Sequence, residues 1–263
     1  MLSERSITFS RPYKVLGDEA DRYFQMLPEH DLSALYNFLN RNRDVLALRR
    51  ALDVGANIGL SSLCMIDIFP DVSVVAFEPS KENFALLTQN VALNGFEERV
   101  QVEELAVGED DGEFGFDFNP DFAAGSRLSV SADGSSYKVH VVPLDGHLKP
   151  GQGPIDFIKI DVEGNEIAAL RGARRILSED RPVVFFECNP TAIAVGDDDL
   201  GGFLARAMEI LGPLGRVEPI SGELFELPGS PDQAAKALKA RMTSQYDVFD
   251  LVNLKPGLEV RAL

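Results

Sequence analysis

The sequence LDVGANIGL, residues 52–60, decides the fold of this chain. A short apolar strand runs into a turn with glycine at Gly55 and Gly59, and apolar residues at helical spacing follow. Glycine lets the backbone turn sharply at these positions and approach a ligand closely. A second apolar run, residues 72–77, ends at Glu78. Strand, glycine loop, helix, strand and acid in this order are typical of a nucleotide site at the edge of a parallel sheet.

The glycine loop differs from the loop that binds dinucleotides. The dinucleotide fingerprint G-x-G-x-x-G has a glycine where the backbone meets the pyrophosphate, whereas this loop reads G-x-N-x-G with Asn57 at that point. Two functions are open to Glu78. Its carboxylate can accept two hydrogen bonds from a ribose diol, or it can merely cap the helix that follows Pro79. The loop therefore speaks against a nicotinamide oxidoreductase.

Apolar runs alternate with helical patterns along most of the chain. The runs are residues 52–54, 72–77, 100–107, 139–142, 155–160 and 183–186. Such alternation predicts a parallel sheet with right-handed crossovers. Two late runs, residues 216–226 and 246–254, lie on either side of a predicted helix at about 233–242 and could add an antiparallel edge. Residues 108–139 interrupt the pattern and predict an extended insertion with a Gly- and Ser-rich tip.

Composition excludes several classes of partner. The 263 residues carry a net charge of −17, which argues against a nucleic acid partner because a basic face would not survive that excess of acid. The two cysteines suggest neither a disulfide framework nor a metal site. We see no signal peptide and no apolar run long enough to span a bilayer, so we expect a cytoplasmic protein. The sequence gives no indication of the oligomeric state.

Four segments together resemble the FkbM family of S-adenosylmethionine-dependent methyltransferases. They are LDVGANIGLSSL, VVAFEPS, IDFIKIDVEGNEIAALRGA and VVFFE, which span about residues 51–190. The resemblance implies a class I methyltransferase fold, which is a Rossmann-like, doubly wound α/β sheet, mostly parallel with an antiparallel edge strand. We expect a methyltransferase domain over residues 51–263, preceded by an N-terminal helical extension, residues 1–50, that contains a helix at 32–43.

The resemblance also implies a cofactor, S-adenosyl-L-methionine, and the residues that bind it. The residues implied to line its methionine side are Asp53, Gly55, Asn57 and Gly59. Glu78 would hold the ribose hydroxyls, and Ala106 would approach the adenine. Family members mostly methylate hydroxyl groups of sugars and natural products. We therefore expect O-methylation of a sugar, glycolipid or small natural product, and the acceptor to be a small molecule or carbohydrate.

A second acidic turn, DVEGNE, follows the apolar run that ends at residue 160. Asp161 could bind the amino group of the cofactor, and Glu163 could be the general base that takes the proton of the acceptor hydroxyl. These two are the predicted catalytic residues, while Glu166 is predicted to cap its helix. The transfer is an in-line displacement and requires no protein nucleophile. His147 is an alternative base, and Ser126 with Arg127 could contact the acceptor.

Several alternatives stay open at this stage. Asp161, Glu187 and Asn189 could hold a magnesium ion through oxygen ligands, although we expect no metal. The acceptor atom could be nitrogen or carbon rather than oxygen. The chain could also be a scaffold that binds the cofactor and has lost catalysis.

Overall fold

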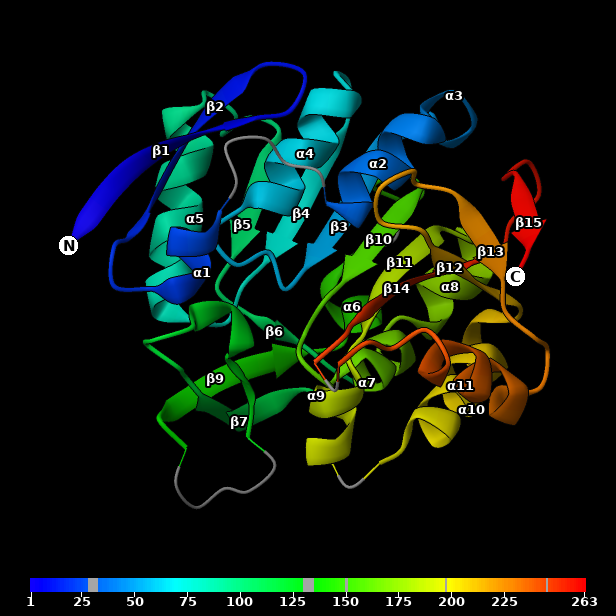
Figure 1. The fold of residues 1–263 in the computed structure, drawn as a ribbon. Coiled ribbons are helices and arrows are strands. Elements are labelled where there is room, and N and C mark those ends of the chain that lie inside the picture. The colour runs from blue at the N-terminus through cyan, green and yellow to red at the C-terminus, as the bar shows by residue number, and fades with distance from the viewer. Residues whose placement is uncertain (28–32, 130–134, 150, 197, 245) are drawn as a thin grey trace.

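A nine-stranded sheet forms the centre of the computed structural model (Figure 1), which describes all residues except 28–32, 130–134, 150, 197 and 245. The strand order is β15-β13-β12-β14-β11-β10-β3-β4-β5. The parallel strands are β3 (Arg50–Val54), β4 (Ser73–Phe77), β5 (Val100–Glu103), β10 (Phe157–Ile160) and β11 (Val183–Cys188). At the other edge lie β12 (Leu214–Val217), β13 (Leu224–Glu226), β14 (Phe249–Asn253) and β15 (Val260–Ala262). Because β14 runs antiparallel to both β11 and β12, the predicted fold class is confirmed.

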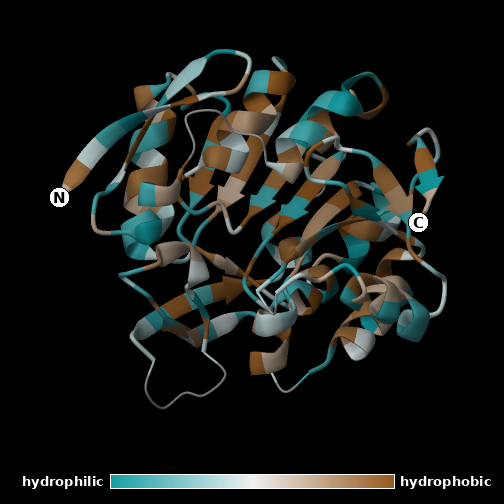
Figure 2. Ribbon diagram, in the orientation of Figure 1, coloured by the Kyte–Doolittle hydropathy of each residue, from teal (hydrophilic) through white to brown (hydrophobic). Residues whose placement is uncertain are grey.

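Side chains of the central strands alternate between two apolar clusters, one on each face of the sheet. In β4, Val74 and Ala76 join one cluster and Val75 and Phe77 join the other. Figure 2 shows the apolar colour of these inner strands. The helices that cover the first face are α2 (Ala34–Arg41), α4 (Leu60–Ile68) and α5 (Lys81–Leu93). The helices that cover the second face are α7 (Glu166–Arg171), α8 (Arg174–Glu179), α10 (Leu200–Leu211) and α11 (Pro231–Lys239).

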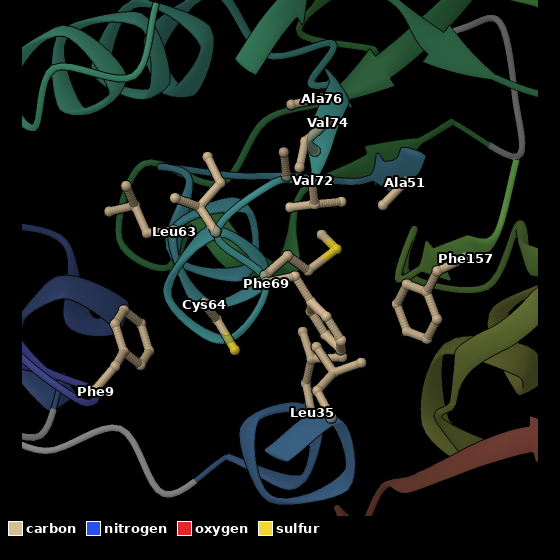
Figure 3. Packing of buried hydrophobic residues seen from close by; sticks show 14 of the residues in the cluster. Phe9, Leu35, Ala51, Leu63, Cys64, Phe69, Val72, Val74, Ala76 and Phe157 are labelled. Carbon is tan, nitrogen blue, oxygen red and sulfur yellow. The ribbon is translucent and has the colours of Figure 1, made fainter. Parts of the chain in front are cut away.

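The first fifty residues are only partly helical, so this part of the prediction was wrong. They begin with an antiparallel hairpin of β1 (Leu2–Thr8) and β2 (Pro12–Asp18), followed by α1 (Arg22–Met26), α2 and α3 (Arg43–Leu46). The helix predicted at 32–43 corresponds to α2, which is capped by Ser33, while residue 32 lies outside the described residues. Phe9 and Leu35 belong to the same apolar cluster as Phe157 (Figure 3), so the extension packs onto the core of the sheet.

The insertion forms a second sheet of four strands in the order β6-β9-β7-β8. Its strands are β6 (Ala106–Val107), β7 (Gly112–Asp117), β8 (Arg127–Leu128) and β9 (Tyr137–Val142). The run 100–107 is therefore not one strand, because β5 belongs to the central sheet and β6 to the second. Part of the predicted tip, residues 130–134, lies outside the described residues.

Shorter elements connect these layers. They are η1 (Ala123–Gly125), α6 (Leu144–His147) and α9 (Pro190–Val195). The late run 216–226 is also divided, because a turn between β12 and β13 makes it an antiparallel pair. In the described part of the chain, no helix is both long and apolar enough to cross a membrane.

Candidate active site

Because side chains alternate along each strand, charged groups come together on one face of the sheet, near the carboxyl ends of its parallel strands. Asp53 on β3 pairs in register with Lys159 on β10, and Glu187 on β11 pairs with Asp250 on β14. These side chains share the face that α2 and α4 cover, at or near the carboxyl ends of the parallel strands. Glu78 and Asp161 come directly after β4 and β10 at the same edge. A cleft of about 740 Å³ opens there, in the position where open α/β sheets bind their ligands.

Two further segments complete the walls of the cleft. Tyr23 and Leu35 line it from the N-terminal segment, and Phe116 and Arg127 line it from the insertion. The two segments meet, because the backbone N–H of Ala123 donates to Asp21 Oδ1 at 3.0 Å. Parts of the chain outside the residues that carry the family resemblance therefore shape the cleft.

The glycine loop fits tightly against the acidic turn. Gly55 has a φ of 79°, and a Cβ atom built on it would lie 1.8 Å from the backbone oxygen of Asp161. No other residue fits there without moving one of the two loops. Asn57 also has a positive φ, 51°, and its backbone N–H donates to Glu78 Oε2 at 2.8 Å. The side-chain oxygen of Asn57 is buried and has no hydrogen-bond partner among the described residues.

The Glu78 carboxylate joins the glycine loop to the start of α5. Its Oε1 accepts from the backbone N–H of Ser80 at 2.9 Å, while Oε2 accepts from Asn57. Ser80 itself caps α5 by accepting from the backbone N–H of Asn83. Burial raises the pKa of Glu78 to about 7, although the two backbone N–H groups oppose this shift. Each oxygen keeps lone-pair capacity for a further donor from the cleft, such as a ribose hydroxyl.

Two residues that the resemblance places on the cofactor lie behind the cleft wall. Asp53 is fully buried, and its Oδ2 accepts hydrogen bonds from the hydroxyls of Ser61 at 2.7 Å and Ser62 at 2.6 Å. Gly59 caps α4 with a φ of 99° and packs under Leu87. Neither residue lines the cleft, whereas Gly55, Asn57, Glu78, Ala106, Asp161 and Glu163 all do.

Three carboxylates converge on the floor of the cleft. One oxygen from each of Asp161, Glu163 and Glu187 lies within 4.8 Å of the others. Burial and the charge of Asp161 raise the pKa of Glu163 to about 8, and the same causes raise the pKa of Glu187 well above its usual range. Burial also raises the pKa of Asp250 to about 7. Glu163 and Asp250 therefore bind and release protons close to neutral pH.

The side-chain oxygen of Asn189, one of the three predicted magnesium ligands, is already engaged by backbone N–H groups. Asn189 Oδ1 accepts from the backbone N–H groups of Thr191 and Ala192 and so caps α9, while its Nδ2 donates to Glu163 Oε2 at 3.3 Å. Glu163 takes the place in the group that Asn189 was expected to fill. The three converging carboxylates are hard oxygen donors of the kind that Mg²⁺ accepts.

The remaining candidate residues occupy different positions. Glu166 has a structural role, but it is not the predicted helix cap, because its Oε1 accepts from the backbone N–H groups of Val162 and Gly164 in the turn that precedes α7. Ser126 and Arg127 line the cleft, and the charge of Arg127 favours the ionised form of Glu163. His147 packs edge-on against Phe77, with 5.7 Å between ring centroids, and is not among the residues that line the cleft.

Sequence reasoning missed two charged residues of the site, Lys159 and Asp250. Both line the cleft. A usable signal was present for each, since Lys159 interrupts the apolar strand FIKI and Asp250 interrupts FDLVN. A charged side chain inside a buried strand is costly unless it is paired.

The fold and the cleft define a protein of the class I methyltransferase type. The solved structure of Methyltransferase FkbM from Methylobacillus flagellatus KT superposes with a TM-score of 0.51 and 20% identity, over 82% of this chain and 47% of that chain. At this identity the likeness shows a common fold. A model of the methyltransferase FkbM domain matches residues 53–212, more than half of the chain, and the chain belongs to this family. S-adenosylmethionine is the cofactor expected of it.

Curated relatives agree with this assignment over part of their length. Methyltransferase sdnD of Sordaria araneosa is 29% identical over an alignment of 152 residues, and the match covers 46% of this chain and 59% of the relative. Hexuronic acid methyltransferase AglP of Haloferax volcanii is 30% identical over 126 residues, which are 48% of this chain and 50% of the relative. The chain thus spans between half and three fifths of the length of these relatives.

Proposed function

We propose that this chain transfers the methyl group of S-adenosylmethionine to a hydroxyl group on a sugar, glycolipid or small natural product. The observation that carries this proposal is the Glu163 carboxyl group. It lies on the cleft wall beside Asp161, and its pKa of about 8 suits a group that accepts a proton near neutral pH. Family membership supports the methyl transfer, and the name of the Haloferax volcanii relative supports a carbohydrate acceptor.

In this proposal the cofactor would lie along the carboxyl ends of the strands. Glu78 and Ala106 line the cleft; Glu78, at the end of β4, would accept hydrogen bonds from the ribose diol, and Ala106 would border the adenine. The amino-acid end would extend over Gly55 toward Asp161, whose carboxylate would meet the cationic amino group. The acidic floor also favours the positive sulfonium centre.

The reaction itself is an in-line displacement at the methyl carbon. The oxygen of the acceptor attacks this carbon as the carbon–sulfur bond breaks, and the products are S-adenosylhomocysteine and a methyl ether. Glu163 takes the hydroxyl proton as the new bond forms. The walls from the N-terminal segment and the insertion would hold the acceptor oxygen at attack distance, and this positioning would contribute to the rate enhancement.

The test is a titration followed by an acceptor screen. Calorimetry of the purified protein with S-adenosylmethionine and S-adenosylhomocysteine should show binding of both, and NAD should not bind. Transfer of a labelled methyl group is then measured to a panel of hydroxylated sugars, uronic acids and glycolipids, with amines alongside. Labelling confined to amines would replace O-methylation by N-methylation. A folded protein that binds neither cofactor form would contradict the proposal and favour a scaffold.

A further inference from the structure

Lys159 is a buried cation at the floor of the cleft. Its residue is 7% exposed, and its strand is otherwise apolar. The ammonium Nζ donates to the backbone oxygen of Gly55 at 2.8 Å and lies 3.4 Å from Asp161 Oδ2. It also lies 3.7 Å from Asp53 Oδ1. Burial opposes the charge, but Asp161 and Asp53 outweigh this cost and raise the pKa of Lys159, so the side chain is a cation at all physiological pH values.

Neutralising Asp53 does not by itself explain where the ammonium lies. Asp53 Oδ2 already accepts from two serine hydroxyls of α4. The Lys159 Nζ is closer to the glycine loop and to the acidic turn than it is to Asp53. The side chain therefore connects two cleft walls that come from segments about a hundred residues apart.

These walls carry two acceptors that would face the amino-acid end of the cofactor in the proposed placement. Gly55 offers its backbone oxygen, which can accept a second hydrogen bond, and Asp161 offers its carboxylate. Asp161 also faces Glu163 and Glu187 across the cleft floor. Without the ammonium, repulsion from these two acidic groups would turn the Asp161 side chain away.

We propose that Lys159 is a positioning residue that locks the glycine loop to the acidic turn and so orients Gly55 and Asp161 toward the amino group of the cofactor. The inference rests on the cofactor placement proposed above. Lys159 then contributes to recognition of the amino-acid end of the cofactor. It does not contribute to recognition of the nucleoside end, which would lie at Glu78.

The experiment compares two ligands that differ only at that end. S-adenosylhomocysteine carries the amino acid, whereas 5′-methylthioadenosine lacks it. In Lys159→Met, calorimetry should show S-adenosylhomocysteine weakened by about tenfold to a hundredfold, the range for a lost hydrogen bond to a charged group. Competition titration should show 5′-methylthioadenosine within threefold of its wild-type affinity. Lys236→Met, an exposed lysine on α11, is the matched control and should change neither.

A second variant separates positioning from simple neutralisation of Asp53. Lys159→Met leaves Asp53 buried without its cation, which could prevent folding. The double variant Asp53→Asn with Lys159→Met removes both charges and should recover melting temperature, yet should keep the selective loss of S-adenosylhomocysteine affinity. Recovery of that affinity, or an equal loss for both ligands, would overturn the proposal. A wild-type protein that does not bind S-adenosylhomocysteine would instead refute the proposed function itself.

Discussion

Glu78 illustrates how one side chain serves both the loop and the ligand. Its two oxygens hold the backbone N–H groups of Asn57 and Ser80. In Glu78→Gln the amide NH₂ must face one of these backbone donors, so the loop loses a hydrogen bond and the ribose loses a charged acceptor. We expect affinity for S-adenosylhomocysteine and for 5′-methylthioadenosine to fall together by about tenfold or more. Unchanged affinity in calorimetry would show that Glu78 does not touch the ribose.

A substitution at Glu163 should lower turnover without weakening cofactor binding. Glu163→Gln keeps the size of the side chain but removes its ability to take a proton. We expect turnover to fall by about a hundredfold or more, the usual contribution of a general base, while affinity for S-adenosylhomocysteine stays within threefold. The exposed Glu98→Gln is the control. A Glu163→Gln enzyme with wild-type turnover would exclude this residue as the base.

The converging carboxylates of Asp161, Glu163 and Glu187 make metal dependence a question for experiment. In the proposed mechanism the cofactor supplies the electrophile and Glu163 supplies the base, so no metal is required. We expect activity in an excess of chelator to equal activity in magnesium. Loss of activity that magnesium restores would assign the three carboxylates to a metal ion instead.

At the scale of the elements, the central strands could be predicted because buried strands need continuous apolar runs. The run predicted at 72–77 is observed as β4 at Ser73–Phe77. The hairpin of β1 and β2 gave a weaker signal, since only four of its fourteen strand residues are buried and one of these four is a glycine, Gly17. Residues 100–107 form strands of two different sheets, and no periodicity within this run indicates where one strand ends and the next begins.

Site residues that belong to a sequence motif could be predicted. Site residues that reach the cleft only through the pairing of distant strands could not. Gly55, Glu78 and Asp161 follow strand ends in the expected order and line the cleft. Asp250 reaches the same floor only because β14 pairs antiparallel with β11. That pairing joins residues far apart in the chain, which spacing alone does not reveal.

The hairpin is fastened to the cleft-bearing part of the fold by Asn90 of α5. This buried side chain accepts from the Leu16 N–H at 2.6 Å, and its Nδ2 donates to the backbone oxygens of Leu16 at 3.1 Å and Ile58 at 2.8 Å. In Asn90→Ala these backbone groups lose their partner, so we expect the free energy of unfolding to fall by about 2–4 kcal/mol. Denaturant titration measures this, with the exposed Gln89→Ala as control. A change below about 0.5 kcal/mol would mean that water replaces Asn90 fully.

For the molecule as a whole, the cleft concentrates acid in a chain whose net charge is already −17. Burial raises the pKa of Glu78 and Asp250 to about 7 and of Glu163 to about 8, so a nearby positive charge can favour their ionised forms, and the only lysine among the residues that line the described cleft is Lys159. A positively charged cofactor is therefore a good electrostatic match for this edge of the sheet.

This charge distribution sets the pH dependence of stability. Glu78, Glu166 and Asp250 have pKa values raised to about 7, and Glu163 has one raised to about 8. Between about pH 5 and pH 8 the folded state binds more protons than the unfolded state, so stability must fall as pH rises. Each unit of pKa shift corresponds to about 1.4 kcal/mol, which predicts a fall of several kcal/mol. The carboxylates with lowered pKa values, such as Asp18 and Asp247, titrate below this window.

Denaturant unfolding of the ligand-free protein at pH 5.5, 7.0 and 8.5 checks the direction. Glu166→Gln removes one of the raised groups without removing a ligand contact, and it should make the fall shallower. S-adenosylmethionine favours the ionised carboxylates, so its affinity, and with it the stabilisation that a fixed concentration provides, should increase with pH across the same range. Stability that rises from pH 5.5 to 8.5 without ligand would show that the cleft carboxylates are ionised in the folded protein, and the acidic floor would then hold its charge before the cofactor arrives.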